Sequence, residues 1–258
     1  MDSAHPQSYH SLYWLVGREI HFPNTDTSWR INEILSEKFR THHDPEGTIR
    51  EITSACIATR IEGSSAWEEA IIKTKLHDEI SAEAYREIYN LKSLTKRHST
   101  CTPTFIDTVT YYQDDEMSVP GGYIVFILME KVPGRDLSHL GSLSSEQRDD
   151  ARLAFIKALW EFSAYGFHHW DPRRQNVVWD EPSKKCYIID LEDVEDLGVL
   201  DSDGLNPRAE FALWSLHGKE EKSPDNHRDD DRMIPDECKQ FYSLEDSVIN
   251  FLVSRVRA

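Results

Sequence analysis

Three polar side chains in the second half of the chain have the types and spacing that metal-assisted phosphoryl transfer requires. Asp171, Asn176 and Asp190 are separated by five and fourteen residues, and the last two each adjoin an apolar run with strand character. Such a pattern brings two oxygen ligands for a divalent cation and a separate carboxylate to one place. In phosphoryl transfer the ligands hold Mg²⁺, and the carboxylate orients or deprotonates the accepting hydroxyl.

The flanking residues extend this pattern to a family motif. The order His169-x-Asp171-x-x-x-x-Asn176, followed by Asp190 after an apolar strand, resembles the catalytic and metal-binding loops of the protein-kinase-like superfamily. That superfamily includes the eukaryotic protein kinases and the small-molecule kinases of the aminoglycoside and choline type. The resemblance covers residues 49–193 and implies an α+β, bilobal protein-kinase-like fold with a β-rich N-lobe and a reduced, mainly helical C-lobe.

The resemblance also implies a role for each polar residue of the loop. Asp171 is expected to take the proton of the attacking hydroxyl, and the forked guanidinium of Arg173 suits the transferred phosphoryl group. Asn176 and Asp190 are expected to hold Mg²⁺ against the phosphates of ATP, while His169 orders the loop. Each residue keeps a structural alternative, because an Asp-Pro pair commonly starts a turn that an asparagine caps.

A second group of expected site residues lies in residues 49–76, which are rich in β-formers. The Gly63-Ser64-Ser65 turn predicts a hairpin whose second strand ends near Lys73. By resemblance, Lys73 contacts the α- and β-phosphates of ATP, and Gly63 belongs to the nucleotide-covering loop. Lys75 faces the same side of the strand and is the alternative lysine. The loop is poor in glycine for this family.

A helix is predicted over residues 81–94, where Tyr85, Ile88, Leu91 and Leu94 have the spacing to bury one face. By resemblance, Glu87 on this helix pairs with the lysine and holds it toward the phosphates. Glu83 is the competitor for that role, and either acid also suits a solvent-exposed position.

Strands are predicted over residues 104–112 and 122–130, and the second leads into a segment that resembles the family's hinge. The resemblance places Met129 at the position that guards the pocket. It also makes the backbone of Glu130 and Val132 available to the adenine ring.

A helix that leads directly into the His169 loop is also predicted. Ser144 and Gln147 form a capping box, the residues Leu153, Ile156 and Trp160 share one face, and Gly166 supplies the stop.

The ends of the chain are less distinctive. Residues 1–26 are expected to form an irregular arm, and the apolar spacing of residues 29–41 predicts a helix. Further helices are expected over 210–216 and 244–256. These patterns divide the chain into an N-terminal arm and helix (1–48), an N-lobe (49–130) and a shortened C-lobe (131–258).

Composition narrows the class of protein. Apolar residues make up 39% of the chain, which indicates a folded globular protein, and no apolar run is long enough for a membrane span. The formal charge of −17 disfavours binding to nucleic acid or to a membrane surface. The acid-rich runs at 190–203 and 225–231 are typical of solvated loops, and the alternative is a rim that attracts a cationic substrate.

Four widely spaced cysteines indicate reduced, packed thiols in a cytoplasmic protein.

Together these observations favour an ATP- and Mg²⁺-dependent phosphotransferase. The segment after Asp190 has neither Asp-Phe-Gly nor a clear Ala-Pro-Glu, and 68 residues follow Asp190, so a small hydroxylated or aminated metabolite is favoured over a protein substrate. Two alternatives are a pseudokinase that serves as a binding or scaffold module and a kinase-fold enzyme that catalyses another reaction.

Overall fold

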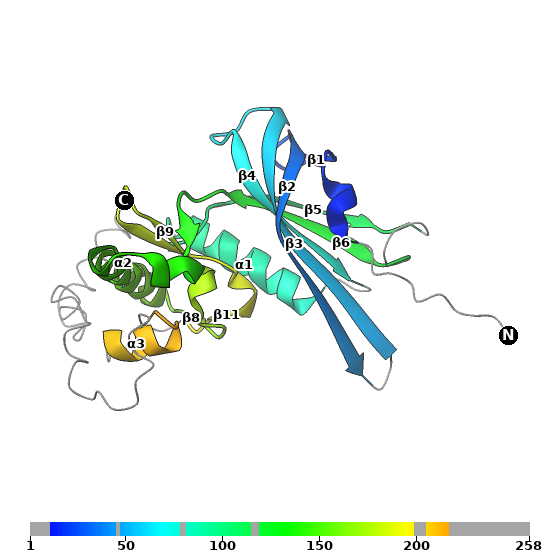
Figure 1. Cartoon of the computed structure of the whole chain (residues 1–258). Coiled ribbons are helices and arrows are strands. Elements are labelled where there is room, and N and C mark those ends of the chain that lie inside the picture. The colour runs from blue at the N-terminus through cyan, green and yellow to red at the C-terminus, as the bar shows by residue number, and fades with distance from the viewer. Residues whose placement is uncertain (1–10, 45–46, 78–80, 115–118, 199–204, 217–258) are drawn as a thin grey trace. The chain divides into compact units, whose positions relative to one another are not determined.

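A strand-rich sheet and few helices make this an α+β protein (Figure 1). The computed structural model describes residues 11–44, 47–77, 81–114, 119–198 and 205–216, with the side chains of 41–50 left out. The chain divides into two compact units. The first unit contains residues 1–88 and 105–131, and the second contains residues 89–104 and 132–258.

The first unit is built on a six-stranded sheet in the order β1-β2-β3-β4-β6-β5, in which all neighbouring strands are antiparallel. A short 3-10 helix, η1 (Leu12–Leu15), precedes it. The strands are β1 (Glu19–Phe22), β2 (Thr27–Asp44), β3 (Gly47–Glu62), β4 (Glu69–His77), β5 (Phe105–Tyr112) and β6 (Tyr123–Glu130).

The strands predicted over residues 104–112 and 122–130 are therefore confirmed as β5 and β6. The hairpin around Gly63 is confirmed as well, because β3 pairs with β4 from Ile52–Leu76 to Thr59–Glu69. Lys73 lies on β4 opposite Ala55, within the paired part of the hairpin.

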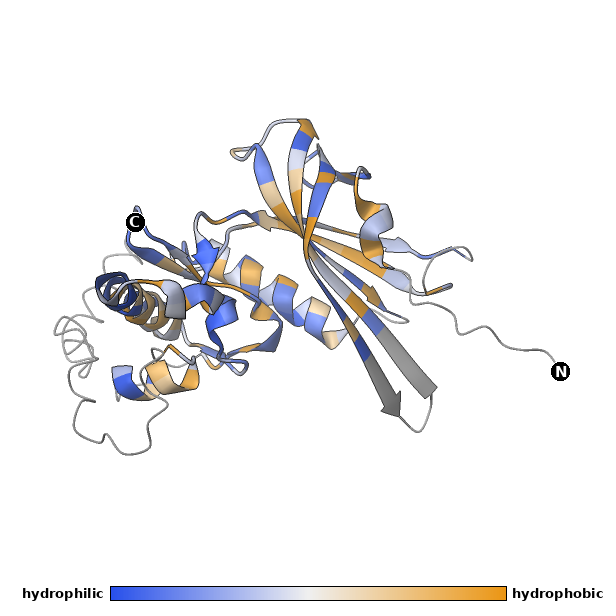
Figure 2. Ribbon diagram, viewed as in Figure 1, coloured by the Kyte–Doolittle hydropathy of each residue, from blue (hydrophilic) through white to orange (hydrophobic). Residues whose placement is uncertain are grey.

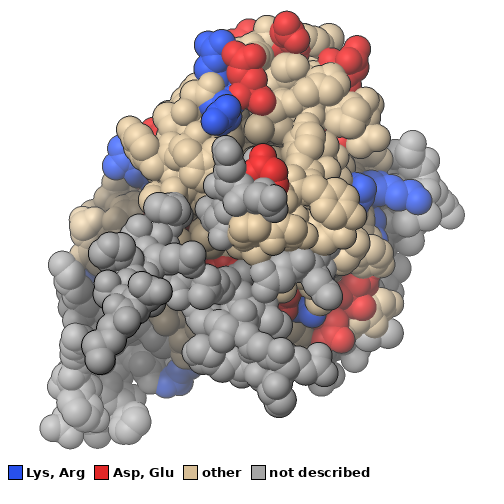
Figure 3. Space-filling view, turned by 90° about the vertical axis from the view of Figure 1, so that its right-hand side faces the viewer, with Lys and Arg blue, Asp and Glu red and all other residues tan. Residues whose placement is uncertain are grey.

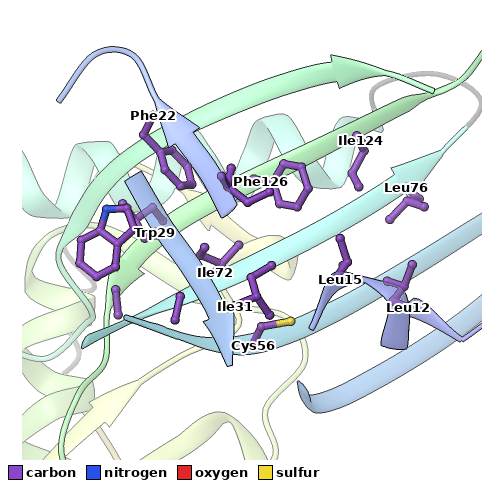
Figure 4. Packing of buried hydrophobic residues seen from close by; sticks show 14 of the residues in the cluster. Leu12, Leu15, Phe22, Trp29, Ile31, Cys56, Ile72, Leu76, Ile124 and Phe126 are labelled. Carbon is purple, nitrogen blue, oxygen red and sulfur yellow. The ribbon is translucent and has the colours of Figure 1, made fainter. Parts of the chain in front are cut away.

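The apolar side of this sheet forms one continuous core (Figure 4). Trp29, Ile31 and Cys56 from β2 and β3 pack with Ile72 and Leu76 from β4, and Ile124 and Phe126 of β6 close the cluster. The sequence predicts an irregular arm over residues 1–26, and this is wrong for the described part of that range. Leu12, Leu15, Ile20 and Phe22 are buried in the same core, because η1 and β1 cover it.

The helix predicted over residues 29–41 is also wrong, because this segment is strand β2. Two register shifts against β3, between Ile31 and Glu33 and between Ile34 and Ser36, interrupt the strict alternation of the strand. The apolar residues Ile31, Ile34, Leu35 and Phe39 have the spacing of a helix, but Leu35 and Phe39 are 53% and 46% exposed on this strand. Their spacing therefore imitates a helix without marking one buried face.

Helix α1 (Ala82–Lys96) confirms the helix predicted over residues 81–94, although its buried face is a different one. Tyr85 is exposed, whereas Glu87 and Asn90 are buried beside Leu91 and Leu94. The mixed colouring of α1 in Figure 2 reflects this polar content. A hydrophobic pattern does not find a buried face that is partly polar, because it counts every charged residue as exposed.

The second unit contains a three-stranded sheet in the order β10-β9-β7 and the strand pair β11-β8. The strands are β7 (Arg135–Asp136), β8 (Phe167–His169), β9 (Val177–Asp180), β10 (Lys185–Ile188) and β11 (Val194–Asp196). The helices are α2 (Ser145–Ala164), α3 (Pro207–Leu213) and the 3-10 helices η2 (Leu137–Ser142), η3 (Arg174–Asn176) and η4 (Leu191–Asp193).

The predicted start and end of α2 are confirmed. The Ser144 hydroxyl accepts from the Gln147 amide at 3.1 Å, and the Gln147 side chain accepts from the Ser144 amide at 2.9 Å. At the other end Gly166 has a φ of 84°, which a residue without Cβ adopts readily. The helix therefore delivers the chain directly to β8 and the His169 loop.

The two helices predicted near the C-terminus have different outcomes. The helix expected over residues 210–216 begins earlier, because Asn206 caps α3 through the amides of Arg208 and Ala209 and Pro207 occupies the first turn. The helix expected over residues 244–256 lies outside the described residues.

The described surface carries charges of both signs, and the described thiols are buried. On the face shown in Figure 3, acidic and basic side chains are interspersed. Among the described helices, none combines the length and the apolar character that a membrane crossing needs. Cys56, Cys101 and Cys186 are free and buried, and burial raises the pKa of each thiol, which confirms packed thiols at these positions. Cys238 lies outside the described residues.

Candidate functional site

The polar residues of the His169 loop converge in the second unit. The chain leaves β8 at His169, passes Asp171 and enters the short helix η3, which ends at Asn176. It then forms the β9–β10 hairpin and returns to Asp190 just after β10. The amide of Ile189 donates to the Asn176 carbonyl at 2.9 Å, and this hydrogen bond holds together the two ends of the segment that contains the β9–β10 hairpin.

The side chains of this loop, here called the acid cluster (Asp171, Arg173, Asn176 and Asp190), contact one another. The Arg173 guanidinium lies 2.7 Å from Asp171 Oδ2 and 3.6 Å from Asp190 Oδ2. Asn176 Nδ2 donates to the backbone oxygen of Asp171 at 3.1 Å and to its Oδ2 at 3.3 Å. One cation therefore bridges two carboxylates that are nineteen residues apart in the chain.

The backbone at Asp190 is unusual. Its φ of 63° and ψ of 60° place it in the left-handed region, which aspartate adopts more often than most residues other than glycine. Such conformations persist where the surroundings enforce them and are concentrated at functional sites. Its side chain is 12% exposed, so the carboxylate is close to water without being open to it.

His169 is buried directly behind the acid cluster. Its Nδ1 accepts the amide proton of Asp171 at 3.2 Å, so Nε2 carries the proton and donates to the Ile189 carbonyl at 3.3 Å. Burial lowers the pKa of the imidazole, although the hydrogen bond to Ile189 and the nearby acids oppose this shift. A neutral ring with both nitrogens in use orders the loop and has no site for a further proton.

The expected lysine and glutamate of the first unit also meet. Lys73 Nζ lies 2.8 Å from Glu87 Oε1, and Lys75 Nζ lies 3.3 Å from Glu87 Oε2. We call these three residues the buried ion group, because the exposed side-chain fractions are 13% for Lys73, 1% for Lys75 and 2% for Glu87. Glu87, and not the partly buried Glu83, holds the lysines. Lys73 and Lys75 both contact Glu87, so this contact does not show which of the two lysines would bind the phosphates.

Gly63 has a structural explanation. Its φ is 80°, and a Cβ at this position would lie 2.3 Å from the Asp26 carbonyl oxygen. This close approach requires glycine whether or not a nucleotide binds, and the role of Gly63 in nucleotide binding stays a prediction.

The two residues assigned to adenine lie where the first unit ends and the second begins. Glu130 is the last residue of β6 and Val132 follows two residues later, and both are partly buried. Met129 is buried on β6. Binding of adenine by these residues also stays a prediction.

Two residues that support the loop were not predicted. Asn90 is buried, and its amide donates to the carbonyls of Leu191 and Val194, each at 2.9 Å, which fixes the turn after Asp190. Trp214 is buried with its ring 5.2 Å from that of His169. The apolar pattern gave no sign of the first contact, because Asn90 is polar and lies outside the face that the pattern predicted. Long-range packing leaves no local sign of the second.

The donor set of the acid cluster suits Mg²⁺. Asp190 offers a carboxylate, and the Asn176 amide turns its nitrogen toward Asp171, which leaves its oxygen at the other end of the group. Groups of three or more His, Cys, Asp or Glu side chains placed for a metal are absent from the described part of the chain. Mg²⁺ commonly takes one or two protein oxygens together with substrate phosphates and water, so Asn176 and Asp190 stay the candidate donors and metal binding stays a prediction.

Comparison with known proteins adds no family to this geometry. Neither a protein-family model nor a curated protein matches the chain.

Proposed function

We propose that this protein is a phosphotransferase of the bilobal protein-kinase-like fold that transfers the γ-phosphoryl group of ATP to a small hydroxylated or aminated metabolite. The observation that carries this proposal is the acid cluster, in which one guanidinium reaches the carboxylates of both Asp171 and Asp190. A separate general base, a phosphate-binding cation and two hard oxygen donors are the parts that the reaction needs.

For a hydroxyl acceptor, the steps assigned to the acid cluster are as follows. The acceptor oxygen attacks the γ-phosphorus while the bond to the β,γ-bridging oxygen breaks, and ADP leaves with that oxygen. Asp171, whose carboxylate is 36% exposed, takes the hydroxyl proton. Arg173 releases its carboxylate contacts in favour of the transferred phosphoryl group. Mg²⁺ bound by Asn176 and Asp190 would neutralise the charge of the phosphates.

The first unit supports the proposal through the order of its elements. A strand bears Lys73, the following helix bears the Glu87 that pairs with it, and two more strands lead to Glu130. This is the order that the resemblance implies. Lys73 is assigned to the nucleotide phosphates because its side chain is the more exposed of the two lysines that contact Glu87.

The test replaces Asp171 with a residue of the same shape that cannot accept the proton. Asp171→Asn is expected to lower turnover by at least about 100-fold, because general-base action contributes roughly 10²- to 10⁴-fold. Intact-mass analysis of candidate metabolites after incubation with ATP and Mg²⁺ measures the added phosphate. Thermal shift with ATP and Mg²⁺ checks that binding is retained.

Asp180→Asn is the matched control, because Asp180 lies on β9 of the same unit and accepts from Ser183. It should turn over at the wild-type rate. Undiminished turnover in Asp171→Asn would remove Asp171 from the reaction, and an added AMP in place of phosphate would indicate a different reaction.

One observation favours the alternative of a binding or scaffold module. Asp171 Oδ2 already contacts both Arg173 and Asn176, so the candidate base is engaged before any substrate binds. Thermal-shift titration with ATP separates the two functions. A shift that requires Mg²⁺, together with phosphate transfer, supports the enzyme, whereas no metal-dependent shift and no transfer support the module.

A further inference from the structure

Trp214 lies next to His169, which hydrogen-bonds to the backbone on both sides of the acid cluster. The indole follows α3 directly, is 2% exposed, and meets the His169 imidazole edge to face, with centroids 5.2 Å apart and planes at 72°. His169 in turn bonds the amide of Asp171 and the carbonyl of Ile189, the residue before Asp190. The indole therefore packs on His169, and His169 bonds the backbone on both sides of the acid cluster.

The indole is itself held from α2. The ring of Phe155 lies 5.2 Å from Trp214 and 6.3 Å from Phe211, so α2 packs against both aromatic residues of this segment. Beyond Trp214, Arg152 Nε donates to the Leu216 carbonyl at 3.0 Å. Helix α2 thus fixes the chain before and after the indole, and the ring cannot move away from His169 without breaking these contacts.

The orientation of the imidazole is what this packing controls. The imidazole is oriented by its bond to Cβ and by two hydrogen bonds, one accepted from Asp171 and one donated to Ile189, so it keeps only the small rotations about its side-chain bonds that these hydrogen bonds allow. A flat aromatic ring across its face or edge removes this freedom at little cost in entropy. The two hydrogen bonds at 3.2 and 3.3 Å are both long, so a tilt would break them easily.

We propose that Trp214 is a positioning residue that acts through His169 to hold Asp171 and the turn before Asp190 at their present spacing. The proposal concerns the architecture of the loop, and only its activity measurement rests on the proposed phosphotransferase. The competing explanation is that Trp214 merely fills the core between α2 and α3. In that case its removal lowers stability without a specific effect on the loop.

Trp214→Leu tests the proposal, because leucine stays apolar but has no ring to set against the imidazole. NMR of the full chain measures the ¹⁵N shifts of the His169 ring and the hydrogen exchange of the Asp171 amide. We expect His169 to lose its single Nε2-protonated form and the Asp171 amide to exchange about tenfold faster. Trp214→Phe should restore both signatures, and Trp214→Met replaces Trp214→Leu if the latter does not fold.

Phe211→Leu is the matched control, because it removes a ring that packs on the same Phe155 from the same segment. It should lower the unfolding temperature comparably and leave both His169 and Asp171 signatures unchanged. The proposal is overturned if Trp214→Leu and Trp214→Met keep the wild-type signatures of His169 and Asp171. It is also overturned if Phe211→Leu changes those signatures as much as Trp214→Leu does.

The activity measurement is a separate arm. If the protein transfers phosphate, Trp214→Leu should lower kcat about tenfold while the KM for ATP stays within about twofold, because a misplaced catalytic group affects the reacting step. If the wild-type protein shows no transfer, the proposed function fails and the NMR result still decides the role of Trp214.

Discussion

The buried ion group and the acid cluster both join a cation to carboxylate at short distance, but they differ in their access to water. Glu87 and Lys75 are almost completely enclosed, whereas Asp171 and Arg173 keep 36% and 39% of their side chains exposed. A buried ionised group depends on its partner, because the protein interior solvates charge poorly. An exposed pair is solvated by water when its partner leaves.

Because the two regions differ in exposure to water, their ion pairs serve different purposes. The buried ion group fixes one arrangement, in which each oxygen of Glu87 has its own lysine. The acid cluster can rearrange, since Arg173 loses little when it exchanges a carboxylate for a phosphate. The buried ion group is suited to stabilise the structure, and the acid cluster is suited to bind and release a ligand.

The largest expected effect is therefore on stability in the buried ion group. Glu87→Ala leaves Lys75 in the interior without this carboxylate, and removing one member of such a pair destabilises by about 3–5 kcal/mol. Arg173→Ala should change the free energy of unfolding by less than about 1 kcal/mol, because its nearer partner, Asp171, is 36% exposed and the Asp190 contact is longer, at 3.6 Å. Urea unfolding followed by circular dichroism measures both.

Glu83 lies on the same helix and is only partly buried, so Glu83→Ala controls for the loss of an acid from α1 and should stay within about 0.5 kcal/mol of wild type. Equal losses in Glu87→Ala and Arg173→Ala would remove the distinction between the two regions.

A smaller effect is expected from the histidine that supports the acid cluster. Burial lowers the pKa of His169 below the value of about 6.5 that it has in the unfolded chain. Between the two values the unfolded state binds more protons, so the free energy of unfolding falls as the pH decreases from about 7. The slope is at most about 1.4 kcal/mol per pH unit.

His169→Gln should flatten this dependence, which urea unfolding at several pH values from about 7.5 to 5.5 measures. The m-value should remain constant across the series, so that the difference reports protonation and not a change of compactness. An unchanged slope in the variant would show that His169 does not contribute to the pH dependence.

The same contrast explains what the sequence could predict. The capping box of α2, the β3–β4 hairpin and strands β5 and β6 follow from local patterns, and all are present. The convergence of Asp171, Asn176 and Asp190 was predicted because polar residues adjoined apolar strands at suitable spacing. Arg173 contacts Asp171 and Asp190, and Asn176 donates to Asp171, whereas the roles of the three residues stay predictions.

The failures arise where local pattern and tertiary structure disagree. The apolar residues of β2 have the spacing of a helix although Leu35 and Phe39 are exposed, and α1 buries Glu87 and Asn90 while it exposes Tyr85, which the pattern placed on the buried face. Trp214 contacts His169 from forty-five residues away, a separation over which periodicity carries no information.

The smallest expected effect comes from an exposed ion pair of the first unit. Lys131 lies 2.7 Å from Glu69, a separation similar to those of Lys73–Glu87 and Arg173–Asp171, but its members are 36% and 55% exposed. A double-mutant cycle with Lys131→Ala and Glu69→Ala should give a coupling of about 0.2–1 kcal/mol. Because the distances are alike, a small value here beside a large loss in Glu87→Ala would identify burial as the deciding variable. A coupling above about 2 kcal/mol would mean that short contact alone is sufficient, and the contrast between the two regions would then need another cause.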